Sequence, residues 1–415
     1  MEHVAEKRWV LLREPEGPLV PYLDLFAREL EGQGFKRKHL GPQIREAASF
    51  SQWLQSKQVT AEAITVEHAK YFFDETTRQP AVGNGERATL RRLLDFLNHL
   101  GVTHPATKPI EFTAIQRVIA TFAAYLRQEQ ALSDKTLIQY CPFAERFLSE
   151  CFGNRPVALA TLRAADVIGF VKQQAAHLSP ARAKAATTAL RSFFRFLRCR
   201  GEIQIDLVAA VPTVPNWAMT GIPRAIAPEH LRAVFAHCPH DTPVGRRDYA
   251  ILMLLARLGL RSCEIVALTL DSIDWEAGSI EVEGKGAGKG KQKASLPLPG
   301  EVGEAIADYL QYGRPITSSR VLFLRANAPI RGLGSPTTIA TIVAAAIGRA
   351  GIDTRHHGTH QFRHALASDM LRHGATLSEI GSVLRHRHTK TTSIYAKVDF
   401  AALRPISLPW PGGVK

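Results

Sequence analysis

The stretch that decides the fold reads HQFRH at residues 360–364 and LRHRHTKTTSIY at residues 384–395. Between these segments apolar residues recur at intervals of three and four, the pattern of helices with one buried face. Histidines, arginines and one tyrosine stand at the ends of these helices, where side chains can converge on a ligand. Guanidinium donors match phosphate oxygens and a phenol is a nucleophile. The pattern therefore favours phosphoryl transfer to or from a tyrosine.

The composition of the chain points to a nucleic-acid partner. Among 415 residues there are 52 lysines and arginines against 38 aspartates and glutamates, a formal net charge of +14. A surplus of this size favours a polyanion. Nucleic acid is favoured over membrane, because no lipid anchor or basic amphipathic terminus accompanies the charge. The length predicts two or three domains rather than one core.

The cysteine count and the hydropathy favour a reduced, cytoplasmic compartment. The five cysteines are odd in number and form no C-x-x-C pair, which argues against a disulfide framework or a zinc ribbon. No apolar window approaches 18 residues, and no signal-peptide pattern opens the chain. Four histidines look like a metal cluster, but no carboxylate or thiolate completes a known ligand spacing, so we expect no metal. They are His356, His357, His364 and His388.

Two helical blocks precede the last third of the chain. Helical periodicity runs from residue 20 to about 100 and again from 112 to 210, with proline-containing linkers after each block. The segment ATLRRLLDFL at 88–97 resembles TALRSFFRFL, which ends at residue 197. A diverged duplication of one helical unit explains this echo, and convergent helix patterning is the alternative.

The last helix of the second block has a basic face. Four cations fall within about 60° of one another at 100° per residue, opposite an apolar stripe. They are either a solvated face over the core or a set of phosphate contacts, and the sequence leaves both open. The cations are Lys184, Arg191, Arg195 and Arg198.

Beyond the second linker the chain is mainly helical with one small antiparallel β-sheet. A long apolar helix over 249–258 closes at Gly259, whose position predicts a left-handed cap, and Ser262 is a candidate cap for the next helix. Alternation at 280–283 and again at 294–298 predicts a β-hairpin with a Gly- and Lys-rich tip. Further helices are predicted over 301–312 and 336–350.

The ordered motifs of this last block resemble those of the tyrosine recombinase (phage-integrase-like) family. They are GLRSCE at 259–264, GKG at 284–286, His360-x-x-Arg363, His386 and Tyr395. The likeness covers residues 224–400, and the block at 112–210 looks like the core-binding domain of the family. It implies a core-binding-like domain over 112–212 and a catalytic domain over 223–405. The helical pattern adds a helical domain over 1–105 beyond this two-domain plan, and a tail remains over 406–415.

The resemblance implies a role for each motif residue and no cofactor. Tyr395 would attack the scissile phosphodiester and form a 3′-phosphotyrosyl bond. Arg261 and Arg363 would clamp its non-bridging oxygens. His360 would assist proton transfer at the tyrosine hydroxyl, and His386 would donate to the phosphate. Against these roles, Arg261 could be paired locally with the nearby Glu264, and a lone tyrosine is more often a core residue.

The hairpin tip and the segment before His386 depart from the family pattern. Lys285 would protonate the departing 5′ oxygen, but counting back from residue 297 favours Lys289 instead, because the turn holds about four extra residues. Lys289 and Lys291 at this tip are further candidates for contact with DNA. The family usually has glycine at the position of Arg385, so the local backbone could differ there.

These observations predict a site-specific recombinase or integrase that acts on double-stranded DNA, as a homotetramer on paired sites. The extra block at the N-terminus favours a mobile-element enzyme with accessory proteins over a minimal recombinase. It should be cytoplasmic and nucleoid-associated. The alternatives are relaxation of DNA in the manner of a type IB topoisomerase and a DNA-binding regulator without chemistry.

Overall fold

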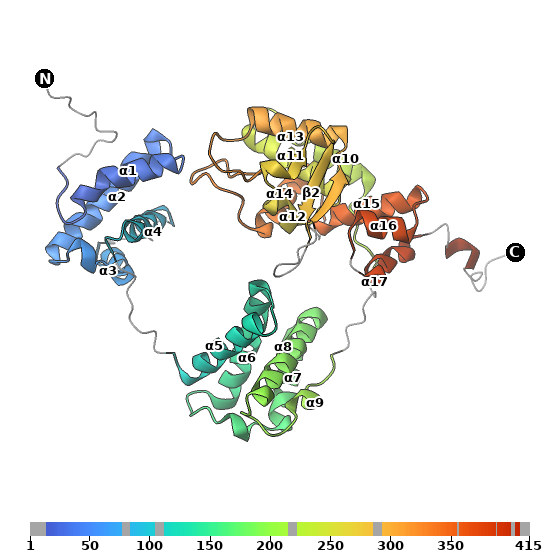
Figure 1. The fold of residues 1–415 in the computed structure, drawn as a ribbon, viewed down its shortest axis with the longest axis horizontal. Coiled ribbons are helices and arrows are strands. Elements are labelled where there is room, and N and C mark those ends of the chain that lie inside the picture. The colour runs from blue at the N-terminus through green and yellow to red at the C-terminus, as the bar shows by residue number, and fades with distance from the viewer. Residues whose placement is uncertain are drawn as a thin grey trace.

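A computed structural model describes residues 14–76, 84–103, 112–214, 222–284, 293–354, 357–386, 388–399 and 403–406. Within these ranges the protein is mainly helical, with one three-stranded antiparallel sheet, which confirms the predicted fold class. Figure 1 shows the helices gathered into separate bodies, and each body has a hydrophobic core of its own. None of the described helices is long and apolar enough to cross a membrane.

The first body consists of four helices around an aromatic and aliphatic core. Along the second and fourth of these helices the apolar residues recur at helical spacing, and those facing inward are fully buried. Phe50 and Phe72 meet edge to face, with ring centroids 5.2 Å apart. The helices are α1 (Val20–Gly32), α2 (Arg37–Ser56), α3 (Val66–Thr76) and α4 (Asn84–His99).

The second body repeats the four-helix plan and adds one short helix. Its last long helix buries Leu190, Phe193 and Leu197, and the last helix of the first body buries Leu90, Leu93 and Leu97 at the matching positions. The segments 88–97 and 188–197 therefore resemble each other in the pattern of residues that they bury. The helices are α5 (Ala114–Gln128), α6 (Asp134–Phe152), α7 (Ala164–His177), α8 (Pro180–Cys199) and α9 (Leu207–Ala210).

The third body holds the sheet. In β2 (Ser279–Glu283) the inward residues Ile280 and Val282 are buried, and Glu281 and Glu283 are exposed, as the alternation predicted. The short strand β1 (Ile273–Asp274) adds to the predicted hairpin of β2 (Ser279–Glu283) and β3 (Lys293–Pro297). The helices are α10 (Pro228–Ala236), α11 (Pro243–Arg257), α12 (Ser262–Ala267), α13 (Gly300–Tyr312) and α14 (Pro336–Arg349).

The C-terminal helices extend this body and carry a small core of their own. Figure 1 shows them in red beside α12 and the sheet. Their buried residues Ala367, Ile380, Leu384 and Tyr395 pack together. The elements are α15 (His360–Arg372), α16 (Leu377–Val383), α17 (Thr389–Thr392) and the 3-10 helices η4 (Ser393–Val398) and η5 (Arg404–Ile406).

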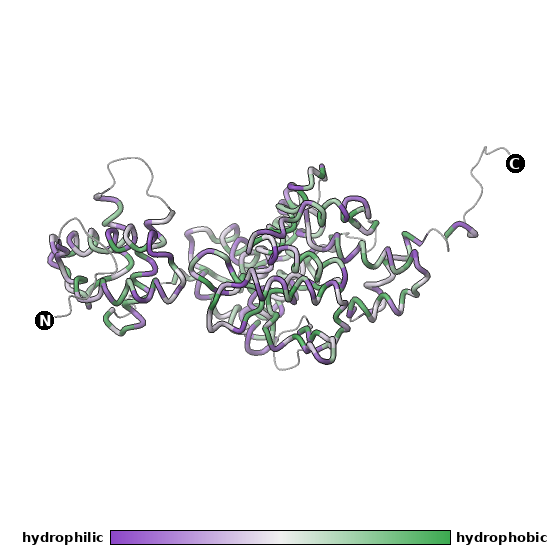
Figure 2. Tube along the Cα trace, turned by 90° about the horizontal axis from the view of Figure 1, so that it is seen from above, coloured by the Kyte–Doolittle hydropathy of each residue, from purple (hydrophilic) through white to green (hydrophobic). Residues whose placement is uncertain are grey.

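Hydrophilic and hydrophobic residues alternate along most of the trace in Figure 2, as expected for amphipathic helices that each cover part of a core. One backbone contact joins the first body to the third. The amide of Ile330, in the loop before α14, donates to the carbonyl of Gln33 at 2.8 Å. Gly34 follows at φ +86°, and a Cβ there would lie 2.4 Å from the Ile330 side chain. This close approach is one that only glycine permits.

Candidate active site

The candidate site forms where the start of α12, the first turn of α15, the turn after α16 and η4 meet. Gly259 makes this meeting possible, because it takes a left-handed φ of +56° at the end of α11, as predicted. A Cβ on Gly259 would lie 2.9 Å from Leu384 and 3.0 Å from Leu366. The glycine is therefore required both for the turn and for the close approach of the C-terminal helices.

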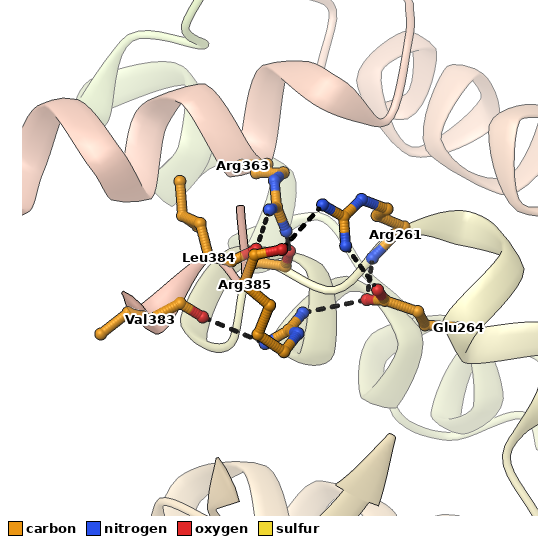
Figure 3. A network of polar contacts seen from close by, with 7 residues as sticks. Arg261, Glu264, Arg363, Val383, Leu384 and Arg385 are labelled. Carbon is orange, nitrogen blue, oxygen red and sulfur yellow. Dashed lines mark hydrogen bonds and ion pairs between the residues drawn. The ribbon is translucent and has the colours of Figure 1, made fainter. Parts of the chain in front are cut away.

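Arg363 lies buried at the centre of the site, with an exposed fraction of 4%. Its guanidinium donates short hydrogen bonds to the carbonyl oxygens of Gly259 and Leu384. Burial, together with the charges of Arg261 and Arg385, lowers the pKa of Arg363 to about 10, so it stays charged at neutral pH. The two carbonyl contacts hold the planar guanidinium of Arg363 in place. Figure 3 shows it next to the guanidinium of Arg261.

Glu264 binds two arginines from opposite sides. Its side chain is fully buried, and it accepts from the Arg261 guanidinium at 2.7 Å and from the Arg385 guanidinium at 2.9 Å. It also accepts from the Arg261 backbone amide at 2.8 Å. Burial raises the pKa of Glu264, but these donors outweigh it and hold the pKa below its usual value.

The ion pair between Arg261 and Glu264 is therefore present. The sequence offered this pair as the alternative to a catalytic role for Arg261. The pair does not use the whole guanidinium, since the other terminal nitrogen of Arg261 lies 3.4 Å from the carbonyl oxygen of Arg385. The predicted cap is wrong. Arg261 precedes the helix and the carboxylate of Glu264 caps it, while the hydroxyl of Ser262 is bonded instead to that of Thr359 at 2.8 Å.

Arg385 has a left-handed backbone, with φ +55°. This is the conformation that glycine adopts most easily, which explains the glycine usual in the family pattern at this position. A non-glycine residue there carries strain of roughly 1–2 kcal/mol. The Arg385 side chain remains mostly buried, donates to Glu264, and leaves its Nε without a hydrogen-bond partner among the residues that the structure describes.

His386 follows this turn and is held by Thr392. Its Nδ1 lies 2.7 Å from the hydroxyl of Thr392, a buried residue at the end of α17. Burial and the charges of three arginines lower the pKa of His386 to about 4, which makes it neutral near pH 7. The contact with Thr392 holds the ring through Nδ1, and Nε2 is the donor in the tautomer in which the Thr392 hydroxyl donates to Nδ1.

Tyr395 is buried, with an exposed fraction of 1%, and its hydroxyl is bonded to His364. The distance from His364 Nδ1 to the hydroxyl oxygen is 3.0 Å. Burial raises the pKa of Tyr395 against the opposing effect of Arg363. The predicted partner of the hydroxyl, His360, stands one turn earlier on α15 and is exposed.

Arg191, one of the predicted DNA contacts, points its guanidinium at its own domain. Its Nη2 donates to the carbonyl oxygens of Val211 and Pro212, at 2.9 and 3.2 Å. The residue thereby fixes the start of the segment that leads to the third body.

The other cations of α8 face outward. Lys184 and Arg195 are exposed, and Arg198 forms an exposed ion pair with Asp206 at 3.0 Å. Their contact with DNA stays a prediction. The predicted lysines of the hairpin tip lie outside the described residues, so the general acid stays a prediction too. They are Lys285, Lys289 and Lys291.

Comparison with known proteins shows the family of this chain. The sequence profile of the phage integrase family matches residues 224–402, and that of the phage integrase N-terminal SAM-like domain matches residues 119–201. A chain of Sinorhizobium fredii, provisionally named an integrase/recombinase, is 46% identical over 99% of this chain and 99% of its own. This chain belongs to the phage integrase family. It is a tyrosine recombinase, an enzyme of the family that performs site-specific DNA recombination.

Further relatives and solved structures agree on the family and its fold. The tyrosine recombinase XerD of Haemophilus ducreyi is 31% identical over 70% of this chain and 95% of its own. A XerH recombinase in a post-cleavage complex with its difH substrate superposes with a TM-score of 0.56, at 18% identity over 69% of this chain and 83% of that one. A lambda integrase dimer bound to a core site gives 0.52, at 16% identity over 67% and 94%. These likenesses show the shared fold of this tyrosine recombinase.

The structure gives contacts in the site to residues for which the sequence predicted no catalytic role. They are the hydroxyl partner His364, the ring partner Thr392 and the ion-pair partner Arg385. Arg385 had a sequence signal, because it replaces the usual glycine. His364 stood out only as one of four histidines and Thr392 not at all, since their contacts depend on how α15, α17 and η4 pack.

Proposed function

We propose that this tyrosine recombinase cuts and rejoins double-stranded DNA at specific sites through a 3′-phosphotyrosyl bond to Tyr395. The observation that carries the proposal is the gathering of Arg261, Arg363 and His386 about the turn that contains Leu384, with Tyr395 in the same small core as Leu384. Three phosphate donors beside one phenol are the parts that tyrosine-mediated phosphoryl transfer needs.

Each residue has one task in this reaction. The Tyr395 oxygen attacks phosphorus, the bond to the 5′ oxygen breaks, and Lys285 or Lys289 supplies the proton that this leaving group requires. Arg261 and Arg363 bind the non-bridging oxygens as charge builds on them. Neutral His386 donates to one of those oxygens through Nε2.

The scaffold around the site supports a DNA clamp. The net charge of +14 favours a polyanion, and the XerH and lambda integrase structures that share this fold are bound to a difH substrate and to a core site. Lys184, Arg195 and Arg198 are placed on an outward face of α8, where they would follow the backbone of the duplex. We infer a homotetramer on paired sites, assisted by accessory proteins, that integrates or moves a mobile element.

The α1–α4 body supports a mobile-element role. The Sinorhizobium fredii relative matches this chain over 99% of its length, so the extra body is shared with a chain named as an integrase/recombinase. In this proposal the α1–α4 body binds a further DNA site or a neighbouring protomer.

Strand joining between two marked duplexes tests the proposal against its nearest rival. Duplexes from the DNA that flanks the encoding gene would be labelled on different strands and incubated with the full chain. Joined strands that require both sites support recombination. Relaxation of supercoiled plasmid without joining would instead support the topoisomerase alternative. DNA binding without either product would support the regulator.

A further inference from the structure

A contact between the first and third bodies lies at the turn between α1 and α2. The amide of Ile330 donates to the carbonyl oxygen of Gln33 at 2.8 Å, and the Ile330 side chain is half-buried. A Cβ on Gly34 would lie 2.4 Å from Cγ1 of Ile330, so the isoleucine packs against the bare glycine backbone. Figure 1 shows the loop before α14 reaching from the third body toward the first.

The loop that makes this contact is a hairpin with a fixed base. Leu324 and Gly332 pair as an antiparallel bridge, and the Arg325 amide donates to the Arg331 carbonyl oxygen at 2.9 Å. Leu324 is buried, and its amide donates to the hydroxyl of Tyr309 at 3.1 Å inside the third body. The base therefore holds the tip of the hairpin at a set place on the third body.

The turn after α1 closes its helix in the same way as the turn after α4. The amide of Gly34 donates to the carbonyl oxygen of Glu31 and that of Phe35 to Leu30, the two bonds of a Schellman cap. Gly101 caps α4 with the same pair of bonds, at φ +71° against +86° for Gly34. A Cβ on Gly101 would meet no atom of the described residues within 4 Å. Capping therefore explains glycine at both positions, and the contact with the third body distinguishes Gly34.

The charge of the first body favours a protein partner. Residues 14–76 and 84–103 hold 10 lysines and arginines against 12 aspartates and glutamates, whereas the whole chain holds 52 against 38. The positive surplus on which attraction to the DNA backbone depends therefore lies in the other parts of the chain. For these four helices a protein contact is favoured over a further DNA site.

We propose that the hairpin before α14 docks on the α1–α2 turn of the same chain as a reversible latch, and that this latch slows the release of bound DNA. The chain joins the first body to the second and the second to the third, so the contact closes the three bodies into a ring. One hydrogen bond and one side chain make a weak contact, but the connecting chain keeps the partners at a high effective concentration. A small contact between separate bodies also leaves them able to move apart, so the ring opens to admit a duplex and closes again. The effect on DNA rests on the proposed function, whereas the docking does not.

Photo-crosslinking of the full chain tests the docking without DNA. The crosslinking amino acid p-benzoylphenylalanine replaces Asn327, an exposed residue of the hairpin, and mass spectrometry identifies the peptides that it joins. We expect crosslinks to the residues around Gln33, in a product that runs as a monomer on a denaturing gel. Absence of such crosslinks would overturn the docking. A product of twice the mass would make the partner a second copy of this chain and would overturn the latch.

Two glycine substitutions separate the docking from the helix cap. Gly34→Ala and Gly101→Ala strain the same left-handed cap in the same body, but only the methyl group at residue 34 collides with Ile330. Ile330→Ala should relieve this collision, because Cβ of residue 330 would lie 3.4 Å from the added Cβ, a distance of ordinary contact. We therefore expect crosslinking to be lost in Gly34→Ala, retained in Gly101→Ala and partly regained in Gly34→Ala/Ile330→Ala. Equal crosslinking in the two glycine variants would contradict the docking.

The rate of dissociation from DNA tests the latch. The protein is bound to labelled nicked duplexes from the flanks of the encoding gene and chased with unlabelled competitor. Gly34→Ala should dissociate about five- to tenfold faster than the wild type, the effect of losing one hydrogen bond with its packing. Gly101→Ala should dissociate at the wild-type rate, and bound protein should form the covalent protein–DNA adduct at an unchanged rate in both variants.

The outcomes of this measurement separate the latch from the reaction. Wild-type dissociation of Gly34→Ala, with its crosslink lost, would overturn the latch. Absence of any DNA binding or adduct with the wild-type chain would instead overturn the proposed function, and the crosslinking result would still decide the docking.

Discussion

The guanidinium of Arg385 donates to the carboxylate of Glu264 at 2.9 Å, across 121 residues of sequence. The same carboxylate receives the Arg261 guanidinium at 2.7 Å (Figure 3). One buried anion thus ties the start of α12 to the turn that leads into His386. Since Arg261 and His386 are both proposed phosphate contacts, Glu264 fixes their separation before DNA arrives.

Removal of this anion should destabilise the protein strongly. Glu264→Gln leaves two guanidiniums close together without their shared partner, and breaking a buried pair in this way costs about 3–5 kcal/mol. The free energy of unfolding from urea titration measures the loss. Glu281→Gln is the control, because its ion pair with Lys293 is exposed on the sheet and its loss should not be measurable. A similar small effect at Glu264 would show that the two arginines find other partners.

The left-handed turn at residue 385 predicts a difference between two small substitutions. Arg385→Gly and Arg385→Ala both remove the ion pair, but only glycine relieves the backbone at φ +55°. The glycine variant should therefore be more stable than the alanine variant by about 1 kcal/mol. Ala131→Gly, at φ +50° in a different body, should gain a comparable amount. Equal stability of the two Arg385 variants would contradict the strained turn.

His386 predicts a loss of stability in acid. In the folded chain its pKa is about 4, whereas in the unfolded chain it returns to about 6.5. The unfolded state therefore binds a proton first, and stability is lost as the pH falls from 6.5 toward 4. Melting temperatures over this range should fall less steeply for His386→Asn than for the wild type. His373→Ala should keep the wild-type slope, and an unchanged slope in His386→Asn would contradict the buried neutral ring.

The proposed arginine clamp predicts a loss of rate rather than of binding. Arg261→Ala and Arg363→Ala remove charge stabilisation made mainly in the transition state, so adduct formation should fall by about a hundredfold or more with modest changes in affinity. Arg257 ends α11 and forms an exposed ion pair with Glu301. Arg257→Ala breaks this pair and should leave the rate unchanged. Loss of affinity alone, with bound DNA cut at the normal rate, would reassign both arginines to phosphate positioning.

The sequence predicts the helical bodies, the sheet and the order of the motifs because each depends on local periodicity. It cannot choose between His360 and His364, since residues one turn apart share a helix face and only the packing of η4 decides which one meets Tyr395. Nor can the sequence show that the Arg191 guanidinium donates to the carbonyl oxygen of Val211, 20 residues later. Periodicity placed this arginine on a basic face, but the path of the following segment determines its partner. The strand β1 has two residues, too few to show an alternation.

The central claim is that Tyr395 becomes covalently linked to DNA. The most direct measurement is mass spectrometry of the peptide that carries a nucleotide remnant after the wild-type chain is trapped on a nicked duplex and digested. The account predicts a single modified peptide with the 3′-phosphate on Tyr395, and no adduct from Tyr395→Phe although this variant still binds the duplex. A remnant on another residue, or an adduct from Tyr395→Phe at the wild-type yield, would contradict it.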